Sequence, residues 1–182
     1  MTELRSLLLL AACALPISAL AAHAHVHGQA KLEVAVDGAA IAIHLDSPLD
    51  SLLGFEHAPY DSRQVKAAEA LVARLRAAQD LFVPSPAAGC RLSAVKIESG
   101  AIPAAILAGG TAMPVKPGRQ PADHDDLDAD FSFHCIRHEA LHAIDVRLFD
   151  AFLRLHGVDV QMVSPRGQTA QRLTPDQRML AW

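Results

Sequence analysis

Alternation of apolar and polar residues marks the first part of the chain that should fold. From Ala30 to Val36 every second residue is apolar, and the same alternation returns from Ile41 to Leu45. Between these stretches, Asp37-Gly38 is a dipeptide that readily closes a tight turn between antiparallel strands. The pattern therefore predicts a β-hairpin.

One long helix is predicted after the hairpin. Apolar residues recur at helical spacing over the stretch 65–75. Either Asp61 or Ser62 can cap the N-terminus of this helix, which we expect to run to about Gln79. Pro84 prevents any further continuation.

Four further strands are predicted from shorter stretches of alternating or apolar sequence, at 92–98, 127–135, 158–163 and 168–173. Between the first two of these, residues 100–121 contain four prolines and four glycines. This composition is typical of an irregular loop.

The stretch 139–155 fits two periods. Helical spacing is shown by Leu141, Ile144, Leu148, Phe152 and Leu155, ahead of Gly157. Strand alternation is shown by Ile144, Val146 and Leu148. Periodicity alone leaves both readings open. Taken together, the patterns predict an α+β fold with an antiparallel or mixed β-sheet and one main α-helix.

The N-terminal residues have the organisation of a cleavable export signal. Arg5 precedes an apolar run from Leu7 to Leu20, and Ala19-Leu20-Ala21 is a small-x-small cleavage site. We expect residues 1–21 to be removed. The remaining residues, 22–182, are then enough for a single domain with its own core.

A lipoprotein signal is the alternative, because Leu10-Ala11-Ala12-Cys13 would allow Cys13 to be lipidated. The apolar run continues past Cys13, where a polar tether is expected, so cleavage and release are favoured. Polar, histidine-rich sequence follows the run at once, which argues against a membrane-spanning helix.

Composition excludes two classes of binding protein. The net charge is −4 with neutral histidines, and the 16 lysines and arginines are dispersed along the chain. A nucleic-acid surface needs clustered basic residues, so we expect no nucleic-acid partner. Aromatic residues make up 4% of the chain, which gives little material for stacking bases or sugars.

Cys90 and Cys135 are the two cysteines that remain once the signal is removed. In an oxidising compartment such a pair favours a disulfide, and the two residues are too far apart for a CxxC motif. The loop-entropy model gives such a bond a stabilisation of roughly 3 to 4 kcal/mol. Two buried free thiols are the alternative.

Histidines provide the first candidate chemistry. His23, His25 and His27 alternate at the expected mature N-terminus. In an extended chain such residues point to one side and can converge on one ion. Imidazole ligands suit zinc, copper and nickel. The alternative is an unstructured tail that binds nothing.

A second candidate cluster is acidic and surrounds one histidine. It consists of Asp123, His124, Asp125, Asp126, Asp128 and Asp130. Such runs are usually solvated loops, but one histidine with carboxylates can also complete a divalent-metal site. Glu56-His57 is a third element, although a lone histidine there is more often a structural hydrogen-bonding residue.

The sequence His138-Glu139-Ala140-Leu141-His142 matches the pattern of zinc proteases. Catalysis would require this stretch to be helical and would require a third protein ligand. Asp145 stands where the longer protease motif needs glycine. No glutamate follows Glu139. A zinc-dependent peptidase therefore remains an alternative, and we expect the protein not to be an enzyme.

Several short motifs occur together along the chain. They are His25-Val26-His27-Gly28-Gln29-Ala30, Leu32-Glu33-Val34-Ala35-Val36-Asp37-Gly38, Ser47-Pro48, Gly54-Phe55-Glu56-His57-Ala58-Pro59, Ala122-Asp123-His124-Asp125-Asp126-Leu127, Asp145-Val146-Arg147-Leu148-Phe149, Val160-Gln161-Met162-Val163 and Gly167-Gln168. In this combination the chain resembles the ZrgA-like periplasmic zinc-binding proteins. The resemblance covers nearly the whole mature chain.

The resemblance implies a periplasmic protein that binds Zn²⁺ and assists its uptake by supplying a zinc importer or that importer's solute-binding protein. It implies a disulfide between Cys90 and Cys135, and a strand at the start of 139–155. The ligands that it implies are His25, His27, His57 and His124, with Glu56, Asp123 and Asp126 as weaker candidates.

Two points remain open at this stage. Members of the group tend to carry a long run of His, Asp and Glu before the Ala-Asp-His-Asp stretch, whereas this chain has Gly118-Arg119-Gln120-Pro121 there. We therefore expect one structured site in place of high-capacity binding. A mature N-terminus at or next to His23 would offer an amine with an imidazole, so a copper-binding protein is a further alternative.

Overall fold

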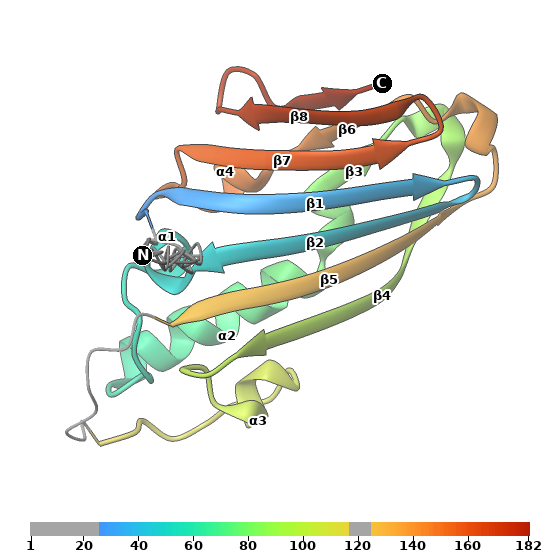
Figure 1. Ribbon diagram of the computed structural model, residues 1–182. Coiled ribbons are helices and arrows are strands. Elements are labelled where there is room, and N and C mark those ends of the chain that lie inside the picture. The colour runs from blue at the N-terminus through green and yellow to red at the C-terminus, as the bar shows by residue number, and fades with distance from the viewer. Residues whose placement is uncertain (1–25, 117–124) are drawn as a thin grey trace, which may run out of the picture.

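Two β-sheets form the framework of the protein in a computed structural model that describes residues 26–116 and 125–182. The larger sheet has six strands in the order β4-β5-β2-β1-β7-β8, and the smaller has three in the order β3-β6-β9 (Figure 1). The larger sheet comprises β1 (Gln29–Asp37), β2 (Ala40–Pro48), β4 (Cys90–Ser99), β5 (Asp126–Cys135), β7 (Gly157–Ser164) and β8 (Gly167–Leu173). The smaller comprises β3 (Phe82–Pro84), β6 (Ala143–Val146) and β9 (Met179–Ala181).

Among the described residues one α-helix is much longer than the others, in agreement with the predicted α+β fold with one main helix. The α-helices are α1 (Leu49–Leu53), α2 (Ser62–Arg76), α3 (Ala104–Leu107) and α4 (Leu148–Ala151). Three short 3-10 helices are η1 (Ala78–Asp80), η2 (Pro86–Ala88) and η3 (His138–Ala140). Only α2, with 15 residues, is long, and strands dominate the described chain.

Strand directions make the larger sheet mixed. β1 is antiparallel to β2, β2 to β5, β5 to β4 and β7 to β8, whereas β1 and β7 are parallel. Consequently the starts of β1, β5 and β7 and the end of β2 all lie at one end of the sheet. We call this the site end. At this end Gln29 is level with Gly157, and Pro48 is level with Asp126.

The β1–β2 hairpin confirms the prediction from alternation. Leu32 and Val34 of β1 and Ile43 and Leu45 of β2 are at most 3% exposed, and Val34 pairs with Ile43. The intervening residues of both strands face away from the core. Because strand side chains alternate between faces, this pairing gives the sheet one apolar and one polar face.

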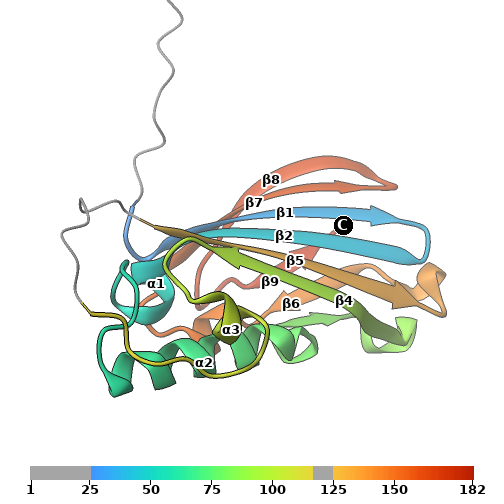
Figure 2. The same cartoon turned by 90° about the horizontal axis from the view of Figure 1, so that it is seen from below.

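The apolar face of the larger sheet is covered and the other face is open (Figure 2). The covering layer contains α1, α2 and the smaller sheet. Phe82 of β3 meets Phe131 of β5 in this interface, with ring centroids 5.1 Å apart. Both side chains are essentially inaccessible to solvent, so this contact joins the two sheets inside one core.

Helix α2 begins where the sequence predicts. The Asp61 side chain accepts hydrogen bonds from the backbone N–H groups of Arg63 and Gln64, both at 2.8 Å, and so caps the helix. The buried face consists of Val65, Ala68, Leu71, Val72 and Leu75. The α-helix ends at Arg76, and η1 then continues the chain as a 3-10 turn over the region predicted to be its last turn.

The region predicted as an irregular loop, 100–121, contains helix α3. Ile102 and Ile106 are 3% and 0% exposed, and Arg76 of α2 donates a hydrogen bond to the carbonyl of Leu107 at 2.6 Å. Helix α3 has only four residues, which is too short to produce a periodic signal, so the sequence pattern did not reveal it. Residues 117–121 of this predicted loop lie outside the described residues.

The ambiguous stretch 139–155 is a strand followed by a turn of helix. β6 runs over 143–146 and α4 over 148–151. The stretch thus contains the strand implied by the family resemblance, but it begins in the 3-10 helix η3 and the strand starts four residues after Glu139. β6 pairs on one side with β3 and on the other with β9. Sequence pattern missed β3 and β9 because three residues are too few to establish a period.

The disulfide between Cys90 and Cys135 is present. The two residues are directly paired at the first position of β4 and the last of β5. They therefore lie at the opposite end of the larger sheet from Asp126, the first residue of β5. Within the described residues, no helix combines the length and apolar character needed to cross a membrane.

Candidate metal centre

His27 enters the structure through a tight turn just before β1. Gly28 has a φ of +77°, a backbone conformation that favours glycine. Its N–H donates to the buried hydroxyl of Ser51 in α1 at 2.9 Å. This bond holds the chain against α1, so His27 lies beside the helix that follows β2.

Glu56 reaches the same place from the loop after α1. Gly54 ends α1 in the left-handed conformation, with φ of +84°, and its N–H donates to the carbonyl of Asp50 at 2.8 Å. From this turn the chain leads to Glu56, two residues later. Oε1 of Glu56 lies 3.2 Å from Nε2 of His27.

This spacing is that of an ordinary ion pair, and it also fits two neighbouring ligands of a tetrahedral metal ion. Zinc binds imidazole nitrogen and carboxylate oxygen at about 2.0 to 2.2 Å. At a tetrahedral angle, donors at such distances are roughly 3.3 Å apart. His27 Nε2 and Glu56 Oε1 therefore lie at a separation that one zinc ion could span without moving either side chain far.

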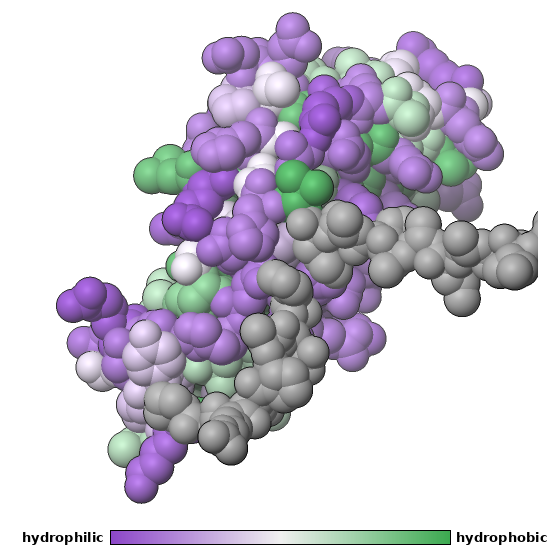
Figure 3. Space-filling model, turned by 60° about the vertical axis from the view of Figure 1, so that its left-hand side comes forward, coloured by the Kyte–Doolittle hydropathy of each residue, from purple (hydrophilic) through white to green (hydrophobic). Residues whose placement is uncertain are grey.

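Exposure of the pair differs between its members. The His27 side chain is 55% exposed and the Glu56 side chain 15%. The carboxylate is thus fixed against protein while the imidazole faces solvent. Figure 3, which brings the site end forward, shows a largely hydrophilic surface with isolated hydrophobic groups.

A second carboxylate lies on the other side of the His27 ring. Oδ2 of Asp50 is 3.7 Å from Nδ1 of His27. The Asp50 carboxylate also forms an ion pair with Arg154, from Nη2 to Oδ2 at 2.9 Å. The imidazole of His27 is therefore flanked by Glu56 at Nε2 and by Asp50 at Nδ1.

His57 follows Glu56 in the same loop and stacks between two aromatic rings. Its ring centroid is 5.2 Å from that of Phe55 and 5.0 Å from that of Tyr60. Its Nδ1 is 3.0 Å from the carbonyl oxygen of Ala58. The tautomer that donates this hydrogen bond leaves Nε2 with a lone pair, which suits a metal ligand.

The acidic cluster divides between several roles. Asp126 starts β5 at the site end, level with Pro48. The Asp125 carbonyl accepts a hydrogen bond from Leu49 N–H at 3.0 Å. The Asp125 carboxylate accepts hydrogen bonds from Ser99 Oγ at 2.7 Å and from Ala101 N–H at 2.6 Å. The Asp125 carboxylate therefore holds a loop, while Asp126 is the first residue of β5 at the site end.

Asp128 and Asp130 continue along β5 on the open face and surround His44 of β2. His44 Nδ1 is 2.8 Å from Asp130, and Nε2 is 3.6 Å from Asp128. Both ring nitrogens are thus engaged by carboxylates. Burial, followed by the negative charge of Asp46, raises the pKa of Asp128 above its ordinary value. His44 and Asp130 also line a shallow groove of about 740 Å³ over the open face.

Three of the predicted ligands, His25, Asp123 and His124, lie outside the described residues, as does His23. Over 26–116 and 125–182, no three His, Cys, Asp or Glu side chains come together closely enough to hold a metal ion. The described part of the predicted site is therefore the pair His27 and Glu56, with His57 and Asp126 on elements at the same end.

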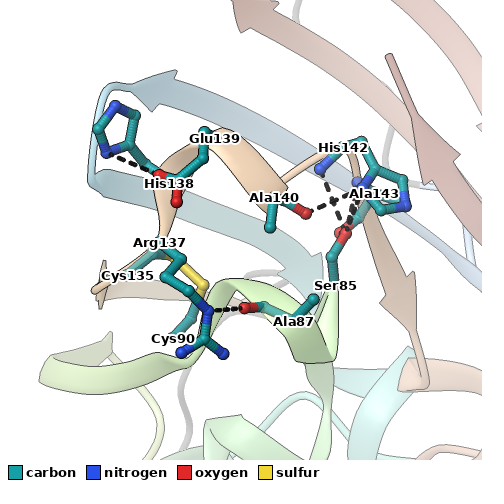
Figure 4. The surroundings of a disulfide bond; sticks show 10 residues. All are labelled: Ser85, Ala87, Cys90, Cys135, Arg137, His138, Glu139, Ala140, His142 and Ala143. Atoms are coloured by element: carbon teal, nitrogen blue, oxygen red, sulfur yellow. Dashed lines mark hydrogen bonds and ion pairs between the residues drawn. A yellow bond between two sulfur atoms is a disulfide. The ribbon is translucent and has the colours of Figure 1, made fainter.

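The zinc-protease pattern does not form the helix that its chemistry requires. His138 lies in the short 3-10 helix η3, and His142 follows it in extended chain before β6. The two imidazoles lie on opposite sides of η3 (Figure 4). Nδ1 of His142 is 2.9 Å from the carbonyl of Ala140 and 3.3 Å from Ser85 Oγ, so this imidazole contributes to local structure. The stretch therefore lacks the α-helix that would place His138 and His142 one turn apart on one face.

Sequence reasoning missed Asp50 and Arg154, which contact each other although 104 residues separate them. Asp50 lies in a five-residue helix with no periodic signal, and Arg154 lies in the connection between α4 and β7. No local motif marks either residue. Because β2 is antiparallel to β1 and β7 is parallel to it, the end of β2 and the start of β7 both lie at the site end, which brings the two segments together.

The fold and the site define a β-rich α+β protein with a histidine–carboxylate pair of the kind that binds borderline divalent metal ions. Residues 24–182 match the family described as ZrgA family zinc uptake protein. The chain belongs to this family. A search of curated proteins finds no match to the chain.

Proposed function

We propose that this protein binds Zn²⁺ reversibly in the periplasm and assists zinc uptake by passing the ion to a zinc importer or to the importer's solute-binding protein. The observation that carries the proposal is the 3.2 Å separation of His27 Nε2 and Glu56 Oε1. Membership of a zinc uptake family favours zinc among the ions that such a pair can bind.

The remaining ligands of the proposed site adjoin described residues in sequence. His25 is two residues from His27, and His124 with Asp123 immediately precedes Asp125, whose carbonyl binds the start of α1. Consecutive Cα atoms are 3.8 Å apart, so this connection limits how far these proposed ligands can be from His27 and from Asp125. His57 and Asp126 complete the proposed set of candidate ligands. A zinc ion would bind four donors from this set.

The exposure of His27 supports reversible binding. Structural zinc sites are closed and fully protein-ligated, whereas the His27 side chain is 55% exposed. An acceptor protein can therefore approach one ligand while Glu56 still holds the ion. In this proposal residues 1–21 are the export signal, residues 22–182 are one periplasmic metal-binding domain, and the protein performs no covalent chemistry.

Calorimetric zinc titration of the purified, disulfide-bonded protein tests the proposal. We expect wild-type protein to bind zinc at micromolar or tighter affinity. We expect His27→Ala, Glu56→Gln and the triple variant His25→Ala/His27→Ala/His124→Ala to bind much more weakly. His44→Ala is the matched control, because it removes a histidine that also contacts carboxylates but lies on the open face.

The outcomes separate the alternatives. Zinc binding that depends on His27 and Glu56 supports the proposal. Equal binding by wild type and by the triple variant would place the site elsewhere and overturn it. A copper titration is run in parallel. If copper binds and zinc does not, the assignment of zinc is overturned in favour of a copper-binding protein.

A further inference from the structure

The guanidinium of Arg154 makes three contacts with Asp50 of α1. Nη2 lies 3.0 Å from Oδ1 and 2.9 Å from Oδ2 of the carboxylate, and Nε donates to the Asp50 backbone carbonyl at 3.0 Å. The Asp50 side chain is 13% exposed. Charge-assisted contacts to a mostly buried carboxylate hold that carboxylate in one orientation.

That orientation places Asp50 at the Nδ1 side of His27. Oδ2 of Asp50 is 3.7 Å from Nδ1, while Oε1 of Glu56 is 3.2 Å from Nε2. When a metal ion binds Nε2, the opposite N–H becomes a stronger donor, and metal-binding histidines almost always direct it to a carboxylate, carbonyl or water. The Asp50 charge is already paired with Arg154, so Asp50 suits this supporting role better than direct ligation.

Arg154 also supports the turn that delivers Glu56. A β-carbon added to Gly54 would lie 3.5 Å from Cδ and from Nε of Arg154, so the arginine packs directly over this glycine. Gly54 N–H and Arg154 Nε donate to the same acceptor, the carbonyl of Asp50. The arginine therefore braces the left-handed turn two residues before Glu56.

The backbone next to Arg154 supports His27 in turn. The N–H of His156 donates to the carbonyl of Gly28 at 2.7 Å. The Arg154 carbonyl lies 3.1 Å from where a β-carbon of Gly28 would be. One segment before β7 thus contacts the turn after His27 and the turn before Glu56.

We propose that Arg154 and Asp50 are positioning residues that hold His27 and Glu56 at the separation zinc requires, and so determine the affinity of the site. The inference rests on the proposed zinc binding at His27 and Glu56. Ligands held in place before binding lose less conformational freedom on binding, which strengthens affinity. Neither residue touches the ion in this arrangement.

The inference is tested by measuring the zinc affinity of the mature, disulfide-bonded protein (residues 22–182) with the substitutions Asp50→Asn, Arg154→Gln and Arg154→Lys. We expect the first two to weaken zinc binding roughly 10- to 100-fold, as loss of supporting groups around metal ligands typically does. Arg154→Lys should recover part of the loss, because lysine keeps the charge but not the three contacts. The double variant Asp50→Asn/Arg154→Gln should be no weaker than the more affected single variant, since the two residues act as a unit.

Two further measurements separate positioning from general destabilisation. Cobalt, substituted for zinc, reports ligand geometry through its visible absorption, which we expect to change in the Asp50→Asn and Arg154→Gln variants at temperatures where both are folded. Arg137→Gln is the control, because Arg137 donates to the carbonyl of Ala87 at 2.6 Å near the disulfide, at the other end of the sheet. It should leave zinc affinity and the cobalt spectrum unchanged.

Failure of the inference differs from failure of the proposed function. If wild type binds zinc through His27 but Asp50→Asn and Arg154→Gln bind within about twofold of wild type, the positioning role is overturned and zinc binding stands. An unchanged cobalt spectrum in both variants would also overturn it. If wild type does not bind zinc, or binds it without needing His27, the proposed site and the positioning role fail together.

Discussion

Gly28 lies so close to His156 that an added β-carbon would be 2.9 Å from Cδ2 of the His156 ring. The turn that leads from His27 into β1 therefore requires glycine at this position, because a side chain would clash with His156 and the φ of Gly28 is positive. The zinc-binding proposal therefore depends on a residue that cannot itself bind metal.

We expect Gly28→Ala to lower the free energy of unfolding by about 2 to 4 kcal/mol, from backbone strain and a steric clash together. Zinc affinity should fall as well, because His27 is displaced. Gly38→Ala is the control, since Gly38 also has a positive φ, of +52°, but has no atom within 4 Å of the added carbon. It should cost only about 1 kcal/mol. Denaturant unfolding and zinc titration measure both effects, and equal losses in the two variants would contradict the steric argument.

Removing the disulfide should separate stability from zinc binding. Cys90 and Cys135 are 45 residues apart in sequence, and the loop-entropy model predicts that the double variant Cys90→Ser/Cys135→Ser loses about 3 to 4 kcal/mol of unfolding free energy. Because the bond lies at the far end of β5 from Asp126, zinc affinity of the folded variant should match that of wild type. Urea unfolding and calorimetry check the two halves of this prediction. A large loss of affinity at a temperature where the variant is folded would show that the two ends of the sheet are coupled.

Asp128 should destabilise the protein slightly at neutral pH. Burial, with Asp46 as a further cause, raises its pKa above the ordinary value of 3.8, so the folded state binds this proton more tightly than the unfolded state does. The penalty is complete above the raised pKa, and it disappears as the pH falls through that pKa and below 3.8. Asp128→Asn should therefore increase stability at pH 7 by less than about 1 kcal/mol, because the side chain is half exposed and its contact with His44 offsets part of the gain.

Urea unfolding at pH 7 and at pH 3.5 measures the Asp128 effect. The difference between wild type and Asp128→Asn should be present at the first pH and mostly lost at the second. Asp159→Asn serves as the control, since Asp159 is an exposed carboxylate 3.4 Å from Arg172 and no gain is expected from neutralising it. A decrease in stability for Asp128→Asn at pH 7 would mean that the His44 contact outweighs burial and repulsion.

Substitutions in the protease pattern should have no effect on zinc binding. Because η3 leaves His138 and His142 on opposite sides, we expect His138→Ala and Glu139→Gln to leave zinc affinity unchanged. Both side chains are more than half exposed, so neither change should cost much stability. Zinc titration and a peptidase assay with zinc-loaded protein provide the measurements. Loss of zinc binding in His138→Ala, or zinc-dependent peptide cleavage that Glu139→Gln removes, would reinstate the peptidase.

The elements that sequence pattern predicted correctly are those long enough to show a period. The hairpin over 29–48 and helix α2 each repeat their buried positions several times, so their faces are evident without tertiary information. β3 and β9 have three residues each, and they exist because β6 pairs with both. Their strand conformation is a consequence of the fold, and a local pattern could not reveal it.

The residues of the candidate site also differ in whether the sequence could reveal them. His27 and Glu56 could be selected because their residue types carry metal chemistry and because the surrounding motifs resemble a family. Asp50 and Arg154 could not, since an aspartate and an arginine 104 residues apart give no local signal. Conversely, His138 and His142 satisfy a spacing rule whose physical basis is a helix, and the chain there is a 3-10 turn followed by extended backbone.

The contact between Phe82 and Phe131 should determine how firmly the smaller sheet is attached to the larger. Phe82 is completely buried, and its ring centroid lies 5.1 Å from that of Phe131, at an interplanar angle of 53°. We expect Phe82→Ala to cost about 3 to 5 kcal/mol of unfolding free energy, from lost burial and a cavity, and Phe82→Leu to cost less because it fills more of that space.

A double-mutant cycle with Phe131→Leu isolates the ring contact itself. We expect a coupling energy of about 0.5 to 1.5 kcal/mol, the usual contribution of a tilted aromatic pair beyond its buried area. Because Phe82 enters the core through β3, and no strand of the smaller sheet supplies His27 or Glu56, zinc affinity of the folded Phe82→Leu variant should stay at the wild-type value. Additive losses in the cycle would show that the two sheets are joined by buried area alone. A weakened zinc site in Phe82→Leu would show that the smaller sheet helps to hold the site end in place.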